Sequence, residues 1–150
     1  MSKTCQNCGA RCCRYFCFEI DKPDSFAEFD DIRWYVAHED VSVHVEQGGD
    51  WYISIMNPCK MLDRSGRCGI YEDRPLICRK YDPEKCDLIG GDYGYKAEFH
   101  TPEQLEAYAR EVLGKKNYER AKAAAREKIA QKQAAKPAKK TRKKRKSTQR

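Results

Sequence analysis

Two short stretches near the middle of the chain alternate between apolar and polar residues. Their apolar positions are Val41, Val43, Val45, Trp51, Ile53 and Ile55. A period of two residues is typical of a β-strand with one buried face. Gly48-Gly49-Asp50 lies between the two stretches and is a turn sequence. The pattern therefore predicts a β-hairpin in which residues 41–47 pair with residues 51–56.

A helical period precedes this hairpin. Ser25 followed by Glu28 is a capping-box sequence, which is typical of the first turn of a helix. The apolar residues at roughly helical spacing after it are Phe26, Phe29, Trp34, Val36 and Ala37. We therefore expect a helix near residues 25–38. The aromatic residues expected to build a small core, and not a platform for stacking bases, are Phe29, Trp34 and Trp51.

Two further helices are predicted after residue 100. Thr101-Pro102-Glu103-Gln104 combines an N-cap residue, a proline at the first helical position and a capping-box glutamine. The apolar residues that follow at helical spacing are Leu105, Tyr108, Ala109, Val112 and Leu113. Gly114 is expected to break or kink this helix. Residues 115–134 are expected to form a second, solvent-exposed helix, because Tyr118 and Ile129 are their only large apolar residues.

The remaining stretches show no sustained period. Residues 57–94 are rich in Gly, Pro, Asp and Cys, which predicts loops and short turns held by something other than a large apolar face. Residues 135–150 contain no Leu, Ile, Val or aromatic residue, so they cannot bury enough apolar surface to offset the entropy of ordering. We expect this last segment to be a disordered basic tail.

The charge is distributed unevenly along the chain. The 150 residues have a net charge of +7, but residues 115–150 carry sixteen Lys or Arg against two Glu. The local charge of this segment is +14, which leaves −7 for residues 1–114. Runs such as Arg142-Lys143-Lys144-Arg145-Lys146 suit sequence-independent binding to phosphates through counterion release. Nucleic acid or the ribosome is therefore a candidate partner of residues 135–150, with a merely solubilising extension as the alternative.

The first residues of the chain show no pattern of a secreted protein. MSKTCQNC lacks the basic start and the apolar run of a signal peptide, and no stretch approaches the ~18 apolar residues of a membrane span. We therefore expect a cytoplasmic protein with no membrane partner. In that compartment thiols stay reduced.

Nine cysteines, all between Cys5 and Cys86, carry the candidate chemistry. In a reducing compartment such a cluster indicates metal binding or catalysis, and the odd count disfavours a disulfide framework. Soft thiolates select zinc or iron–sulfur clusters, and a closed site commonly takes four of them. The candidate ligands are Cys5, Cys8, Cys12, Cys13, Cys59, Cys68, Cys78 and Cys86. Two closed sites would use all of these, whereas one site would leave packing thiols.

Cys12 and Cys13 are adjacent in the sequence, and Cys17 follows four residues later. Adjacent side chains diverge on a helix or a strand, so which of Cys12 and Cys13 ligates is open. Cys17 lies in an apolar stretch and is expected to be a buried core thiol. The three histidines lack ligand spacing with the cysteines and are expected to be ordinary residues. Arg74 is expected to pair with a carboxylate.

These cysteines and their neighbours resemble the zinc- or iron-chelating cysteine-cluster family known as CxxCxxCC or YkgJ-like proteins. The residues that carry the resemblance are Cys5, Cys8, Gly9, Cys12, Cys13, Cys59, Leu62, Cys68, Ile70, Tyr71, Glu72, Arg74, Pro75, Cys78 and Arg79. The chain departs from the pattern where two residues, instead of one, separate Gly9 from Cys12. The resemblance covers residues 5–86 and implies a bound metal. Some larger relatives resemble flagellin lysine N-methylases that use S-adenosylmethionine, but the glycine pairs of this chain are typical of turns and not of a nucleotide loop.

The sequence as a whole predicts a small, loop-rich α+β fold stabilised by metal, with one β-hairpin packed against short helices. We expect a cysteine-cluster domain over residues 1–100, C-terminal helices over residues 101–134 and the basic tail over residues 135–150. The expected function is cytoplasmic metal binding, with zinc slightly favoured over iron or an iron–sulfur cluster. Two alternatives are a metal- or iron–sulfur-dependent protein-modifying enzyme of the methylase-like kind, and a nucleic-acid- or ribosome-associated module.

Overall fold

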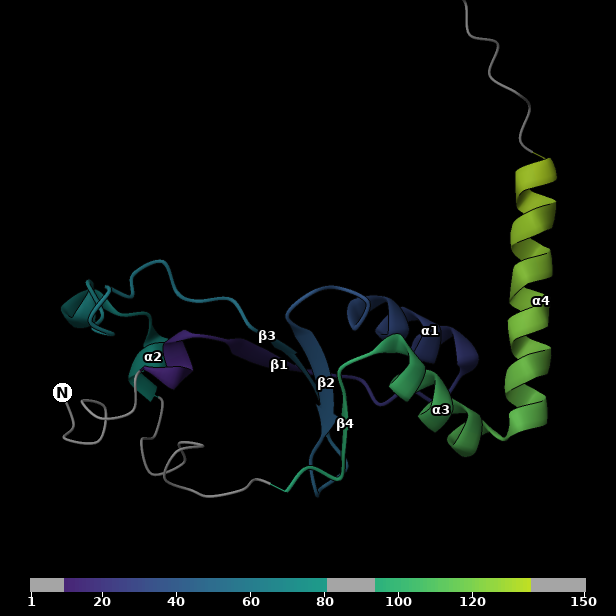
Figure 1. Cartoon of the computed structure of the whole chain (residues 1–150), viewed down its shortest axis with the longest axis horizontal. Helices are drawn as coiled ribbons and strands as arrows, with labels where there is room; N and C mark the ends of the chain where they lie inside the picture. Colours follow the sequence, from purple (N-terminus) through teal and green to yellow (C-terminus); the bar gives the residue numbers. More distant parts are fainter. Residues whose placement is uncertain (1–9, 81–93, 136–150) are drawn as a thin grey trace, which may run out of the picture.

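A four-stranded antiparallel sheet forms the centre of the molecule (Figure 1). The computed structural model describes residues 10–80 and 94–135. The strands lie in the order β1-β3-β2-β4, and their bounds are Phe16–Ile20 for β1, Val41–Val45 for β2, Trp51–Ile55 for β3 and Ala97–Phe99 for β4. The predicted hairpin is confirmed as the two central strands, β2 and β3. Both strands end slightly earlier than the alternation indicated.

The two outer strands were not predicted. β1 carries the sequence FCFEI and β4 only three residues, so neither offers enough positions for a period to show. They become strands because the edges of the hairpin offer unpaired backbone groups: β1 pairs along β3 and β4 along β2. The sequence-based α+β class is confirmed, with a larger sheet than the single hairpin that was expected.

The pairing register separates an apolar face of the sheet from a polar one. Val43 lies between Ile53 and Phe99 on the apolar face, since residues directly opposite each other in a sheet share a face. On the polar face His44 lies opposite both Tyr52 and Glu98. The apolar face supports the core.

Helix α1, Phe26–Tyr35, begins at the predicted capping box. The Ser25 hydroxyl accepts a hydrogen bond from the Glu28 amide at 3.4 Å, and the Glu28 carboxylate accepts one from the Ser25 amide at 3.1 Å. The prediction that Trp34 belongs to the core is wrong, because its exposed fraction is 62%. Trp34 is five residues after Phe29, about 140° around the helix, so it lies off the buried stripe. Its indole contacts Tyr35 and His38 at the surface.

Two C-terminal helices follow β4 as predicted. Helix α3 is Pro102–Leu113 and starts with the expected capping box of Thr101 and Gln104. Gly114, at a φ of 79°, ends α3 and starts helix α4, Lys115–Ala134. That φ lies in the left-handed region, which glycine adopts without a steric cost. Tyr118 is the only buried residue of α4, so the expectation of a solvent-exposed helix is confirmed.

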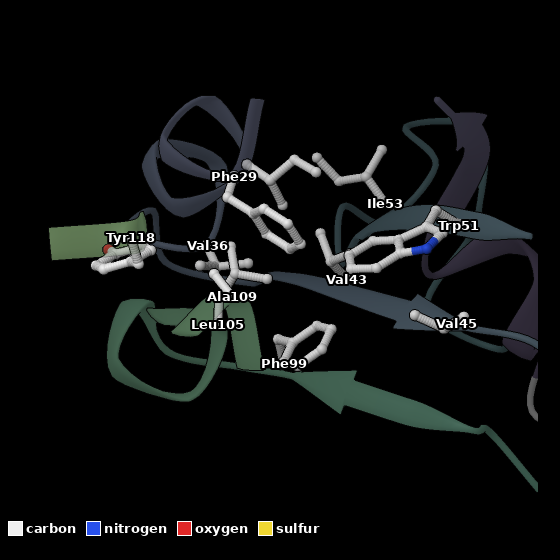
Figure 2. Packing of buried hydrophobic residues seen from close by; sticks show 11 residues of the cluster. Phe29, Val36, Val43, Val45, Trp51, Ile53, Phe99, Leu105, Ala109 and Tyr118 are labelled. Atoms are coloured by element: carbon white, nitrogen blue, oxygen red, sulfur yellow. The ribbon is translucent and has the colours of Figure 1, made fainter. Parts of the chain in front are cut away.

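The core lies between the apolar face of the sheet and helices α1 and α3 (Figure 2). Its buried members are Phe29, Ile32, Val36, Val43, Val45, Trp51, Ile53, Phe99, Leu105, Ala109 and Tyr118. Aromatic rings meet edge to face here, as between Phe29 and Trp51 at a centroid distance of 6.0 Å. Burying each large apolar side chain contributes about 1.5–3 kcal/mol, so this cluster holds sheet and helices together.

The cysteine-bearing segments lie at the other end of the sheet from the helices (Figure 1). They comprise a short 3-10 helix η1, Arg11–Cys13, the loop after β3 with a second 3-10 helix η2, Tyr71–Asp73, and helix α2, Leu76–Lys80. We call residues 10–15 and 56–80 the cysteine lobe. Among the described residues, no helix is both long and apolar enough to span a lipid bilayer.

Candidate metal centre

The cysteine lobe brings together thiols that are far apart in the sequence. Cys12 and Cys13 lie on η1, Cys59 and Cys68 on the loop after β3, and Cys78 on α2. These segments lie side by side at the same end of the sheet (Figure 1). The other three predicted ligands, which are Cys5, Cys8 and Cys86, fall outside the described residues.

A backbone hydrogen bond joins the two halves of the lobe. The Cys59 amide donates a hydrogen bond to the Cys13 carbonyl at 2.7 Å. This bond holds together two residues between which three strands of the sheet lie in the sequence. This contact follows from the pairing of β1 with β3, because Phe16 lies opposite Ile55 and both strands continue into the lobe. The sheet therefore places the first cysteine cluster against the second.

A tight loop brings Cys68 back towards Cys59. Leu62 and Cys68 form an isolated antiparallel bridge, and the Leu62 amide donates to the Cys59 carbonyl at 3.0 Å. Asp63 closes the loop: its carboxylate accepts hydrogen bonds from the Ser65 and Arg67 amides, both at 2.8 Å. The hydrogen bond from the Ser65 hydroxyl, followed by that from the Arg67 amide, lowers the pKa of Asp63 to about 2.

Two arginines fix the chain before and within α2. The Arg74 guanidinium donates to the Tyr71 carbonyl at 2.8 Å and lies 3.6 Å from the centre of the Tyr71 ring. Arg79 donates to the Arg74 carbonyl at 2.9 Å and to the Glu72 carbonyl. Among the described residues Arg74 makes no ion pair with a carboxylate, and the expected pairing stays a prediction. Its hydrogen bond to the Tyr71 carbonyl stabilises the turn before Cys78.

The thiols of the lobe share one electrostatic neighbourhood. Burial raises the pKa of the half-buried Cys13 thiol, and a hydrogen bond with the Cys12 side chain lowers it. Negative charge on three further thiols raises this pKa again, and these belong to Cys59, Cys68 and Cys78. Thiolates that repel one another in this way favour a bound cation, which compensates their charge. Within residues 10–80 and 94–135, however, no three His, Cys, Asp or Glu side chains yet form a coordination shell.

The residues of the lobe fit a soft or borderline metal. Thiolate sulfur is the ligand that zinc and iron–sulfur clusters take, and no described pair of these cysteines forms a disulfide. The lobe also lacks a core of its own, since none of residues 10–15 and 56–80 is buried. Its large apolar side chains face solvent instead, and these are Met56, Met61, Ile70, Leu76 and Ile77. Packing alone therefore does not hold the lobe together.

Cys17 lies outside the lobe, and the expectation that it is buried is wrong. It belongs to β1, is exposed and lies opposite Ser54 on the polar face of the sheet. Alternation along β1 sends Phe16 and Phe18 to the other face, where they remain about half exposed, whereas Ile20 at the end of the strand packs against the core. The apolar neighbours that suggested burial thus belong to the opposite face.

The polar face carries a groove that sequence reasoning missed. The groove has a volume of about 970 Å³, and all three histidines line it, with Arg11 and Arg14 at the end next to the cysteines. His44 forms its floor: its imidazole lies 3.4 Å from the Ser54 hydroxyl and stacks on Tyr95 at 4.2 Å. In the sequence, the groove is indicated only by His44, which takes one of the polar positions between the alternating valines of the hairpin.

Comparison with known proteins gives one match. The sequence profile of the CxxCxxCC family, "Putative zinc- or iron-chelating domain", matches residues 4–104. No similar curated protein and no similar solved structure was found. The match covers more than half of the chain and includes all nine cysteines, the sheet and the start of α3, whereas α4 lies beyond it.

Proposed function

The chain belongs to the CxxCxxCC family, and from that premise we propose that it is a zinc- or iron-binding protein whose thiolate site holds the cysteine lobe together. One observation carries this proposal. Five thiols come from three segments of a lobe that has no buried residue. A lobe of this kind needs a cross-link other than an apolar core, and a thiolate-bound ion is such a cross-link.

A bound ion would contribute more folding free energy to the lobe than its hydrogen bonds do. A typical hydrogen bond contributes about 0.5–1.5 kcal/mol, whereas a structural zinc site contributes about 10–16 kcal/mol of folding free energy at neutral pH. The lobe hydrogen bonds, including that from Cys59 to Cys13, hold the cysteine-bearing segments next to one another. The ion would supply most of the stability.

We assign a four-thiolate site to Cys13, Cys59, Cys68 and Cys78. The support for this choice is that the Cys13 thiol is half-buried and feels the charge of the other three, whereas Cys12 is exposed. The candidates for a second site are then Cys5, Cys8, Cys12 and Cys86.

Zinc is the metal we favour, ahead of iron or an iron–sulfur cluster. Zinc closes a four-thiolate shell without redox chemistry, which suits a purely structural cross-link, whereas an iron–sulfur cluster would supply electron transfer. We place the protein in the cytoplasm, where reduced thiols remain available as ligands. This placement rests on cysteine usage.

Elemental analysis and an absorption spectrum of anaerobically purified protein test the proposal. We expect stoichiometric zinc and no visible colour, or stoichiometric iron and a brown spectrum if the cluster reading is right. One ion per chain would support the first site alone, and two would support both. Protein that carries no stoichiometric metal and keeps the lobe ordered in chelator would contradict the proposal.

A second candidate function is association with nucleic acid or the ribosome through residues 135–150. The observation that favours it is the local charge of +14 over residues 115–150. Clustered Lys and Arg bind phosphates without sequence preference and release counterions. Retention on nucleic acid at low salt by the full chain, and its loss as salt rises, is the expected result.

A further inference from the structure

The first two turns of helix α4 pack against helices α1 and α3. Tyr118 is 2% exposed and meets the Phe26 ring edge to face at 5.1 Å. No residue of α4 after Tyr118 is buried. The rest of the helix therefore extends away from the sheet and the other helices (Figure 1).

Ion pairs fix the direction of this helix at its base. Glu106 on α3 accepts a hydrogen bond from the Lys122 ammonium at 2.7 Å. Arg110 lies 2.8 Å from carboxylate oxygens of both Glu106 and Glu119. These contacts use one of the two acidic side chains of α4 and tie the base of the helix to α3.

Most basic side chains of α4 form no ion pair with the rest of the described chain. The helix has seven Lys or Arg against Glu119 and Glu127. Six of the basic residues make no ion pair within the described part of the chain, and these are Lys115, Lys116, Arg120, Arg126, Lys128 and Lys132. Cationic charge thus continues from the base of α4 into the basic segment that follows it.

Distance separates this charge from the acidic body. The twelve residues from Ala123 to Ala134 span about 18 Å, at about 1.5 Å per residue. The Debye length at physiological ionic strength is about 8 Å. Salt therefore screens the outer part of α4 from the −7 charge of residues 1–114. An approaching polyanion meets the cationic helix without the repulsion of the body.

We infer that α4 is a rigid cationic arm that binds nucleic-acid phosphates. This inference rests on the second candidate function and adds a structured element to it. Arg126 and Lys128 lie about 200° apart around the helix, so the arm offers cations on two sides, as a helix between two phosphate strands would. An anionic membrane fits less well, because Ile129 is the only large apolar side chain beyond Tyr118 and an interfacial helix needs an apolar face.

Binding to DNA and RNA duplexes, measured by fluorescence anisotropy over a range of salt, tests the arm. The proteins are the full chain, a chain that ends at Ala134, and each of these with Arg126→Gln, Lys128→Gln and Lys132→Gln. Glutamine keeps helix propensity, and circular dichroism checks that the helix remains. The matched control is the full chain with Lys22→Gln, Arg64→Gln and Lys96→Gln, which removes three exposed cations from the body.

We expect the chain that ends at Ala134 to bind either duplex at low salt, more weakly than the full chain. The three α4 substitutions should reduce the salt slope of the full chain by about 2 to 3, since each lost phosphate contact removes about 0.9. The control substitutions should leave the slope unchanged.

The outcomes separate the arm from the tail. If the full chain binds no duplex, the second candidate function and the arm both fail. If the full chain binds but the chain ending at Ala134 does not, or if the α4 variant matches the control, the tail acts alone and the arm is overturned. Tighter binding to phosphatidylserine vesicles than to either duplex also overturns the arm.

Discussion

Single side chains decide the geometry of the lobe because it has no core to do so. Cys13 lies half-buried among other thiols, while Cys12, one residue away, is exposed. The two side chains share a hydrogen bond on the 3-10 turn of η1, so their adjacency in the sequence leaves open which of them is the better ligand. Burial of the thiol, which depends on the loop after β3, is what distinguishes the pair.

Substituting these two cysteines one at a time is the most direct test at the residue scale. We expect Cys13→Ser to abolish binding at the site shared with Cys59, Cys68 and Cys78, with a loss of one ion per chain. Cys12→Ser should leave that site filled. Cys17→Ser is the control, since Cys17 lies on the sheet and outside the lobe. Metal content by elemental analysis reports the result, and loss of that ion from Cys12→Ser but not from Cys13→Ser would refute the assignment.

The loop closed by Asp63 should depend on pH, because its hydrogen bonds are made to the ionised carboxylate. The Asp63 carboxyl has a folded-state pKa of about 2, below the ordinary value, so its contribution to the loop is present above the unfolded pKa and is lost as pH falls from about 4 towards 2. The amide signals of Ser65 and Arg67 in metal-free protein should therefore shift with a midpoint near 2 in an NMR titration. Asp63→Asn should abolish that transition; a midpoint near 4 in the unaltered chain would contradict the hydrogen-bonded turn.

Residue-level prediction succeeds where the environment is local and fails where it is not. The capping boxes at Ser25 and Thr101 follow from neighbouring residues, and both are present. The burial of Trp34 and Cys17 depends on which face meets a distant element. The sequence around each is apolar, yet both side chains face solvent.

At the scale of elements, periodic segments were predictable and short ones were not. The hairpin and the helices α1, α3 and α4 each repeat their pattern over several positions. Strand β4 has three residues and owes its conformation to β2. The lobe has no period at all, because turn hydrogen bonds such as those of Asp63 set its path.

The ion pair of Glu106 and Lys122 joins α3 to α4 and should contribute to the free energy of unfolding. The Lys122 ammonium lowers the pKa of Glu106 by donating a hydrogen bond to its carboxylate in a half-buried site. The stabilisation is therefore present above the unfolded pKa of about 4.3 and is lost as pH falls through the lower folded pKa. Glu106→Gln should reduce the free energy of unfolding by about 1 kcal/mol at pH 7.

Urea unfolding at neutral and at acidic pH measures this effect. The difference between the unaltered chain and Glu106→Gln should shrink in acid, where the carboxyl group is protonated in both the folded and the unfolded state. Glu111→Gln, an exposed change on the same helix, is the control and should have little effect at either pH. A pH-independent difference would mean that lost packing, not the ion pair, causes the destabilisation.

The whole molecule has two parts that are stabilised differently. The core between sheet and helices rests on burial, as at Leu105, which is 0% exposed. The lobe rests on hydrogen bonds and, as proposed, on metal. The chain joins the two parts at the start of β1 and the end of β3, and the Met56 amide donates to the Asp40 carbonyl at 2.8 Å. We therefore expect the two parts to lose structure independently.

Hydrogen exchange with and without chelator tests this independence. Chelator should remove protection in residues 56–80 while the amides of β2, β3 and α3 stay protected. Leu105→Ala should do the reverse: it should cost about 2–5 kcal/mol of global stability and leave the metal content of folded protein unchanged. Loss of protection throughout the molecule on chelation would show instead that core and lobe form one cooperative unit.

The link between Cys13 and Cys59 has a further consequence for the spacing of the chain. Phe16 pairs with Ile55, and the contact from Cys59 to Cys13 forms after two intervening residues on one strand and three on the other. A strand shifted by one residue would turn every side chain to the opposite face. The number of residues between the sheet and Cys13, a proposed ligand, is therefore constrained: inserting one residue at position 14 should leave the core intact but move Cys13 relative to the other proposed ligands.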